Sequence, residues 1–270
     1  MADRLTFLLG KDPATSHGGD MTMFRTLRAI AEERYDVETI CLSDQPHVRE
    51  VGAVRVAKPP ASPVRLLVGS AVGRRSLVHT RFDIDGVCAA VEQSSANRFV
   101  AVHSYMAEPY LRARGAAPGR DLLISTEVPE SSVWRRTRGL GARFEARRLQ
   151  RDELRIARTA RAIAGYDRDE IEAYRAGGIS SAHWLPLTLA PAERIDVAAT
   201  PPRLVVLGNR TWAPNALAAQ TMVEWWPEIS AGIPNAELVL VGPRADDAIS
   251  SLPSGVNDLG FVEDVGEVLS

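Results

Sequence analysis

Asn209 and Arg210 are the residues of this 270-residue chain whose types and position most clearly point to chemistry. They follow an apolar segment, residues 203–208, and precede a helix predicted over about 216–230. A second apolar segment comes next, so strand, helix and strand predict a right-handed parallel βαβ unit. We expect Asn209 and Arg210 at its ligand edge, where unpaired helix amides and a forked guanidinium suit an anion such as phosphate.

Two adjacent glycines, Gly18 and Gly19, lie in a loop between a predicted strand and a predicted helix. Glycine permits positive φ and a close approach of the backbone to a phosphate or a sugar. An ordinary βα turn uses the same freedom, so this alternative stays open. The spacing from Gly10 does not match G-x-G-x-x-G, which argues against a dinucleotide fingerprint.

Two titratable residues stand after predicted strands of the first half. His103 ends the segment 99–103, where an imidazole can bond a sugar hydroxyl, although a satisfied core histidine is the alternative. Glu127 follows the segment 122–125 and could accept hydroxyl protons, although a capping or surface carboxylate is the simpler alternative. Residues 167–170 are most simply explained as the cap and acidic first turn of a helix.

The composition limits the class of protein. A hydrophobic content of 45% and a net charge of -2 indicate a globular chain without the overall charge expected for nucleic-acid binding. No apolar run reaches the ~20 residues of a membrane span, and a strand begins directly after Met1-Ala-Asp-Arg, so we expect no signal peptide. The expected location is cytoplasmic. Cys41 and Cys88 are expected in the core, and no metal-ligand spacing is found.

The order of elements predicts an α/β fold with two Rossmann-like domains. We assign residues 1–190 to an N-terminal domain, 191–202 to a linker rich in Ala and Pro, and 203–270 to a second domain with few strands. The predicted strands of the first domain are 5–10, 35–42, 51–56, 99–103, 122–125, 162–165 and 184–187. One helix is predicted over 64–76.

A long basic helix is predicted over residues 132–160, with a break near Gly139 and Gly141. Its many arginines could meet anionic lipid headgroups, which would give peripheral contact with the inner face of a membrane. A solvated helix surface is the simpler alternative.

The second half resembles the donor-binding domain of retaining glycosyltransferases of family 4. The resemblance lies in Gly208-Asn-Arg-Thr-Trp-Ala-Pro-Asn215, the following helix, the segment 234–242, and Gly260-Phe-Val-Glu-Asp-Val265. The first half is similar more loosely, through Gly18-Gly19, His103 and residues 167–170. This resemblance implies the GT-B architecture, in which two Rossmann-like domains face a cleft.

The resemblance also implies roles for residues. His103 would contact the donor sugar and Arg210 the donor diphosphate, as the catalytic pair. Donor binding would further involve Gly18, Gly19, Gly208, Asn209, Gly242, Phe261 and Val262. His17 and Glu127 would bind the acceptor. No metal or other cofactor would be needed, because fixed basic donors stabilise the departing nucleotide.

This sequence departs from the pattern of the family in two ways. The lysine that many relatives carry shortly after the arginine is absent from 211–215, and the family's Glu-x7-Glu motif and final crossing helix would lie beyond Ser270. We therefore expect a chain that lacks part of its donor site and shows weak or no transfer by itself.

The leading hypothesis is a transferase that moves a hexose from GDP-mannose or UDP-glucose to a glycan or lipid with retention of configuration. A non-catalytic nucleotide- or sugar-binding module is the alternative. An NAD-dependent oxidoreductase shares the fold type, but the fingerprint glycines are missing from both halves.

Overall fold

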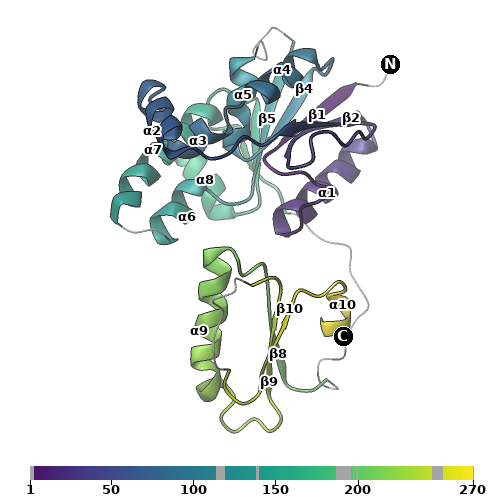
Figure 1. Ribbon diagram of the computed structural model, residues 1–270, viewed down its shortest axis with the longest axis vertical. Helices are drawn as coiled ribbons and strands as arrows, with labels where there is room; N and C mark the ends of the chain where they lie inside the picture. The colour runs from purple at the N-terminus through teal and green to yellow at the C-terminus, as the bar shows by residue number, and fades with distance from the viewer. Residues whose placement is uncertain are drawn as a thin grey trace. The chain divides into compact units, whose positions relative to one another are not determined.

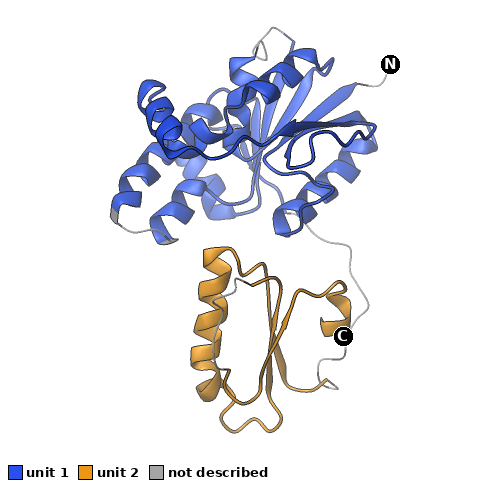
Figure 2. Ribbon diagram, viewed as in Figure 1, with its two compact units in different colours: residues 1–188 blue, residues 189–270 orange. Residues whose placement is uncertain are grey.

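The computed structural model describes residues 3–113, 119–137, 140–186, 196, 198, 200–244 and 252–269. The chain (Figure 1) divides into two compact units, residues 1–188 (unit 1) and 189–270 (unit 2), shown in Figure 2. Each unit contains its own parallel sheet. The predicted linker, residues 191–202, lies mostly outside the described residues.

Unit 1 contains a seven-stranded sheet in the order β3-β2-β1-β4-β5-β6-β7, in which all pairings are parallel. Because the strands share one direction, the loops that follow them gather at one edge of the sheet. The strands are β1 (Arg4–Leu9), β2 (Asp36–Ser43), β3 (Ala53–Ala57), β4 (Arg98–Val102), β5 (Asp121–Thr126), β6 (Ala162–Gly165) and β7 (Ala182–Trp184).

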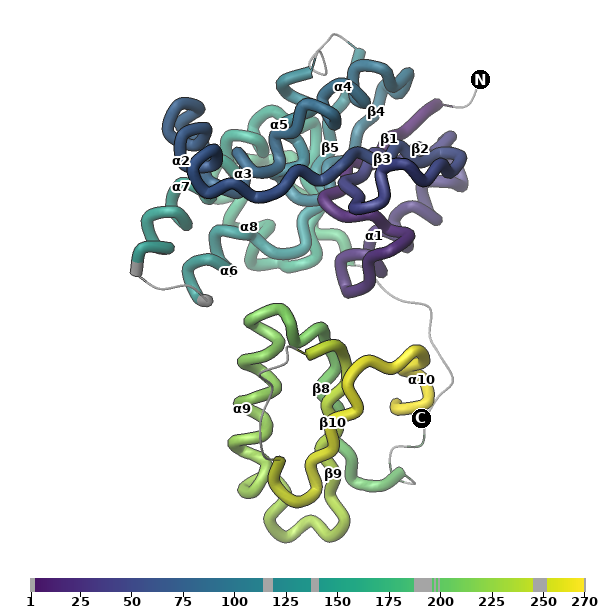
Figure 3. Tube along the Cα trace, in the orientation of Figure 1, coloured from purple at the N-terminus to yellow at the C-terminus, as the bar shows by residue number. Residues whose placement is uncertain are grey.

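The helices of unit 1 connect these strands. Figure 3 shows how the chain leaves β3 and crosses unit 1 to reach α2, on the side where α7 also lies. The helices are α1 (Gly19–Glu32), α2 (Pro63–Val72), α3 (Leu77–Phe82), α4 (Asp85–Gln93), α5 (Ala107–Arg112), α6 (Glu130–Thr137), α7 (Leu140–Ala157) and α8 (Arg168–Ala176), with a 3-10 turn η1 (Ser104–Met106).

Alternating strand residues form two cores, one on each face of the sheet. Leu8 belongs to the larger core, with apolar residues of α4, α5, α7 and α8. Its neighbours Phe7 and Leu9 belong to the smaller core on the opposite face, where Phe24 of α1 packs edge-on against Phe7 at 5.3 Å. The apolar strand segments are therefore covered on both faces near β1, as is typical of parallel sheets.

Two helices predicted from the sequence have different boundaries in the structure. The segment 64–76 forms α2 only as far as Val72, and Ser76 then caps α3 by accepting a hydrogen bond from the His79 amide. The basic segment 132–160 forms two helices, α6 and α7, in agreement with the break predicted near Gly139. At Ser76, a side-chain cap that satisfies a free amide marks the start of α3, which the apolar pattern did not indicate.

Unit 2 contains β8 (Arg203–Leu207), α9 (Ala213–Ile229), β9 (Glu237–Val241), β10 (Val256–Gly260) and α10 (Gly266–Leu269). Its parallel sheet has the order β10-β9-β8, and α9 packs on one face through Val223 and Trp226. The predicted βαβ unit is thus confirmed. No helix in the described part of the chain is long and apolar enough to cross a bilayer.

Candidate active site

The carboxyl-end loops of unit 1 bring together several sequence-predicted residues. The loop after β1 ends at Gly18, whose φ of 129° only glycine adopts readily, and α1 begins at Gly19. Arg25 holds this loop by donating to the carbonyls of Pro13 and Ser16, at 2.8 and 3.2 Å. The left-handed backbone at Gly18 explains that glycine, and it fits a simple βα turn as well as a ligand loop.

His103 lies directly after β4 in a strained backbone conformation, with φ of 69° and ψ of 147°. Its amide donates to the carbonyl of Ser125 at 2.8 Å, and its ring stacks on Tyr105 with centroids 5.2 Å apart. Burial lowers the pKa of His103 to about 4, so the imidazole is neutral at neutral pH. The imidazole of His103 is half-buried and neutral, so it can form a hydrogen bond with a ligand hydroxyl from a fixed position.

Glu127 follows β5 at the same edge. Burial, together with the charge of Asp20, raises the pKa of Glu127 to about 7, while Lys11 opposes the shift. No hydrogen bond to its carboxylate occurs among the described residues, and α6 begins only at Glu130, so Glu127 caps no described helix. A carboxyl with a pKa near neutrality can both accept and return a proton in this pH range.

Lys11 and Asp20 complete this group with an ion pair of 2.6 Å. Their charges act on His103 and on Glu127, which locates all four residues in one neighbourhood. We call Lys11, Asp20, His103, Tyr105 and Glu127 the strand-end cluster of unit 1. The sequence analysis did not identify Lys11, Asp20 or Tyr105 as site residues. The positions of Lys11 and Asp20, on either side of the loop that contains Gly18 and Gly19, could have indicated these two residues.

A buried carboxyl lies behind this edge. Glu170 of α8 accepts a hydrogen bond from Thr126 at 2.7 Å, while its second oxygen has no partner among the described residues. Burial raises the pKa of Glu170 to about 7. Asp167 caps α8 by accepting from the Asp169 amide at 2.8 Å, which confirms the capping interpretation of the segment 167–170.

The strand ends of unit 2 are joined through close backbone contacts. The Gly242 amide donates to the Gly260 carbonyl at 2.6 Å, and the Gly208 amide donates to the Val241 carbonyl at 3.0 Å. Gly242 has φ of 122°, and a Cβ atom there would lie 2.0 Å from the Gly208 carbonyl oxygen. Glycine at this position is therefore required by the fold of unit 2 itself.

Arg210 is buried rather than open to a ligand. Its guanidinium donates to both carboxylate oxygens of Asp258, at 2.6 and 2.8 Å, and to the Gly242 carbonyl at 2.9 Å. The side chains of Arg210 and Asp258 are each 5% exposed, and Arg210 holds the pKa of Asp258 at about 2. The expected direct grip of Arg210 on a diphosphate would require this pair to open.

Arg244 is the accessible cation beside this pair. Its side chain is 52% exposed and donates to Asp258 at 3.0 Å, and the Gly260 amide bonds the same carboxylate at 3.0 Å. One buried carboxylate is thus shared by two guanidinium groups, and only that of Arg244 is exposed. The sequence analysis missed both Asp258 and Arg244, although an aspartate inside a strand is unusual enough to have signalled a special role.

The first turn of α9 offers fewer amides than expected. The helix begins at Ala213 instead of near 216, Pro214 has no N–H, and the Asn215 amide bonds the Trp212 carbonyl. The Thr211 amide donates to the Asn209 side chain at 3.0 Å. Asn209 therefore shapes the turn through its own side-chain oxygen, and the start of α9 alone is a weak anion site.

Phe261 and Val262, which were also predicted to bind the donor, directly follow β10.

Comparisons with known proteins place the fold. No protein-family model and no curated protein matches the chain. Among solved structures, the chain is similar to sucrose-phosphate synthase from Thermosynechococcus elongatus, with a TM-score of 0.65, 14% identity, and coverage of 96% of this chain and 71% of that chain. The chain has a Rossmann-like α/β fold of the GT-B type.

Two further structures are similar over 96% of this chain. They are the glycosyltransferase of kitacinnamycin (TM-score 0.49, 15% identity, 71% of that chain) and the calicheamicin glycosyltransferase (TM-score 0.49, 14% identity, 70% of that chain). The GT-B fold confirms the predicted fold class, while the roles predicted for His17, His103, Glu127 and Arg210 stay predictions.

Proposed function

We propose that this GT-B chain takes part in glycosyl transfer from a nucleotide-sugar donor. The observation that carries the proposal is the GT-B fold, combined with a strand-end cluster in unit 1 whose titratable groups suit sugar hydroxyls. We assign the sugar and acceptor contacts to unit 1, and the donor phosphates to unit 2 together with the Gly18-Gly19 loop of unit 1.

In unit 1, His103 bonds a hydroxyl of the donor sugar as a neutral imidazole, and Glu127 receives a hydroxyl of the acceptor. The support for these roles is the strained backbone of His103 and the raised pKa of Glu127 at the same edge. The Gly18-Gly19 loop, with His17 beside it, offers backbone to the acceptor and to the donor phosphate.

In unit 2, Arg244 is the side chain that meets the donor diphosphate. Arg210 is a positioning residue, because it holds Asp258, which in turn orients Arg244. A fixed guanidinium stabilises the negative charge that develops on a departing nucleoside diphosphate, in the manner of other oxyanion-stabilising donors. Gly208, Gly242 and the segment from Gly260 to Val262 complete the nucleotide side.

The finer assignments rest on the sequence resemblance. They are a hexose donor of the GDP-mannose or UDP-glucose type, a glycan or lipid acceptor, retention of configuration, and a reaction without a metal. Of the Arg-rich segment proposed for membrane contact, Arg148, Arg151 and Arg155 bond groups within unit 1.

Nucleotide binding by the chain and by two arginine variants tests the proposal. A ligand that binds the folded form raises the melting temperature, so UDP or GDP should raise it while NAD should not. Arg244→Gln should weaken this stabilisation, because it removes a charged donor from the diphosphate. Arg203→Gln, at the opposite end of the same sheet, is the matched control and should leave it unchanged. Equal loss in both variants would refute the assignment of Arg244.

A further inference from the structure

A polar pocket of about 610 Å³ opens in unit 1 between the α2–α3 turn, α5 and α7. Glu108 and Asp152 line it, and none of its lining residues belongs to the strand-end cluster. Five arginines from these three elements also line it, namely Arg74, Arg75, Arg112, Arg151 and Arg155. The pocket is therefore a separate feature with an arginine-rich wall.

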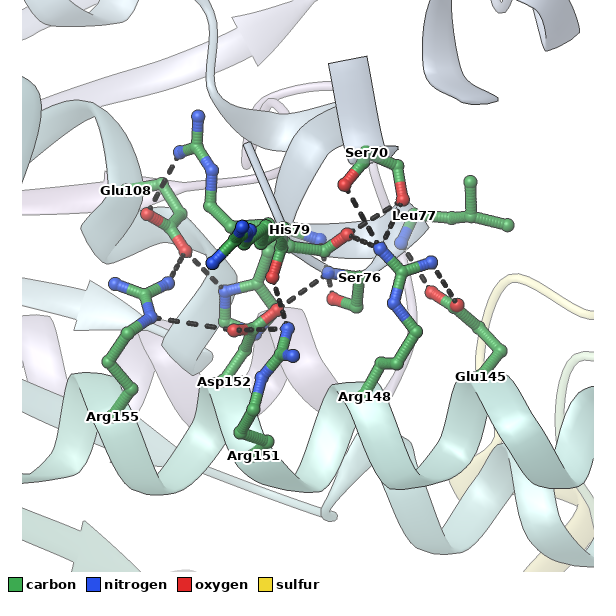
Figure 4. A network of polar contacts seen from close by, with 12 residues as sticks. Ser70, Ser76, Leu77, His79, Glu108, Glu145, Arg148, Arg151, Asp152 and Arg155 are labelled. Carbon is green, nitrogen blue, oxygen red and sulfur yellow. Dashed lines mark hydrogen bonds and ion pairs between the residues drawn. The ribbon is translucent and has the colours of Figure 1, made fainter. Parts of the chain in front are cut away.

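Arginines of α7 fix the frame of this pocket (Figure 4). Arg148 donates to the carbonyl of Ser70 at 3.0 Å and to that of Arg75, and Arg151 donates to the carbonyl of Arg74. Asp152 accepts from the Ser76 amide at 2.6 Å. The α2–α3 turn is thus held against α7 through its backbone groups, which makes the pocket wall preformed.

Glu108 is the buried anchor of the pocket, with a side chain 4% exposed. It bonds His79 at 2.8 Å, Arg75 at 3.1 Å and Arg155. Although burial opposes ionisation, the bond from His79 and the charges of the two arginines hold the pKa of Glu108 below its usual value. Glu108, which is ionised at neutral pH, therefore orients Arg75 and Arg155 at the pocket wall.

The arginines of the pocket carry more charge and more N–H donors than the nearby carboxylates pair with. Besides Glu108 and Asp152, the nearby carboxylates Asp83 and Asp85 pair with Arg75 and Arg112, so five arginines face four carboxylates. Arg74 adopts a left-handed backbone with φ of 51°, and its exposed side chain forms no hydrogen bond or ion pair with the described residues. Arg151 is 54% exposed and reaches Asp152 only at 3.4 Å.

We propose that this pocket binds the phosphate group of a small phosphorylated molecule. Guanidinium forks match phosphate oxygens in geometry and charge, and several of them converge here on a fixed frame. The volume lies within the range of about 300–1,000 Å³ typical of small-molecule sites, which favours a phosphate ester or diphosphate over inorganic phosphate alone. The pocket and its ligand are independent of the glycosyl transfer proposed above.

Pyrophosphate, titrated by calorimetry into the full chain, is the test ligand. The titration is made in the Arg244→Gln background, which removes the proposed phosphate contact of unit 2. Saturable binding is expected, and Arg74→Gln or Arg151→Gln should each weaken it by about tenfold, the effect of one lost charge-assisted hydrogen bond. Arg147→Gln is the matched control, because Arg147 is exposed on the same helix but does not line the pocket.

The outcomes distinguish a specific pyrophosphate site from non-specific attraction of the anion to basic side chains. Binding that is unchanged in Arg147→Gln but weakened about tenfold in each of the two pocket variants supports the proposal, provided that circular dichroism shows all variants folded. Binding that does not saturate, or an equal loss in Arg147→Gln and Arg74→Gln, would overturn it.

Discussion

At the scale of single residues, burial decides what the charged groups of this chain can do. Arg210 stands where a phosphate ligand was expected, yet its guanidinium is occupied by Asp258 and by the Gly242 carbonyl. Arg244, two residues beyond Gly242, is the exposed partner of the same carboxylate. The role predicted for Arg210 is therefore divided between two arginines. Arg210 positions Asp258, and Arg244 is the accessible cation.

Removal of Arg210 should destabilise unit 2 strongly. Arg210→Met leaves the carboxylate of Asp258 buried without its main partner, which costs about 3–5 kcal/mol in the free energy of unfolding. The double variant Arg210→Met with Asp258→Leu should lose clearly less, because both buried charges are gone. Denaturant unfolding of the two variants checks this. A double variant as unstable as the single one would contradict the paired arrangement.

Two carboxyls should make stability depend on pH. Burial raises the pKa of Glu127 and Glu170 from about 4.5 to about 7, so the folded chain keeps protons that the unfolded chain releases in this window. The free energy of unfolding should therefore fall as the pH rises from 4.5 to 7, and stay lower above it.

Glu127→Gln and Glu170→Gln should each flatten this fall, because the amide has no proton to release. Melting temperatures from pH 4.5 to 8 measure the effect, with the exposed Glu172→Gln as control. An unchanged slope in both buried variants would show that these carboxyls titrate normally.

At the scale of elements, strands were more predictable than helix boundaries. The apolar segments 5–10 and 35–42 became β1 and β2 almost unchanged, because a strand buried in a parallel sheet is a continuous apolar run. The helix predicted over 64–76 ends at Val72, and α3 begins only at Leu77, after the cap at Ser76, which depends on local geometry. The Arg210–Asp258 pair joins residues 48 positions apart, and no local pattern predicts such a contact.

The strand ends of unit 2 should tolerate no side chain at Gly242. Gly242→Ala would bring a Cβ to 2.0 Å from the Gly208 carbonyl oxygen at a positive φ, so the backbone must shift. We expect a loss of about 3 kcal/mol or more in unfolding free energy. Gly19→Ala is the control, because nothing lies within 4 Å of its Cβ position and it begins α1. Similar stability of the two variants would contradict the described strand ends.

At the scale of the whole molecule, the two units carry different parts of the proposed reaction. Unit 1 offers a neutral imidazole and a carboxyl with a pKa near 7 at its strand ends, and unit 2 offers an exposed arginine, Arg244, suited to phosphate. The fold class followed from the order of strands and helices. The strand-end cluster and the arginine pocket depend on contacts between distant segments, so the sequence indicated only some of their members.

Direct titration of nucleotide sugars tests the central claim of glycosyl transfer from such a donor. Calorimetry with UDP-glucose, GDP-mannose and NAD on the unmodified chain compares the donor class with the dinucleotide class. We predict saturable binding of one nucleotide sugar with a stoichiometry near one, and no saturation with NAD. Binding of NAD with neither nucleotide sugar bound would contradict the account.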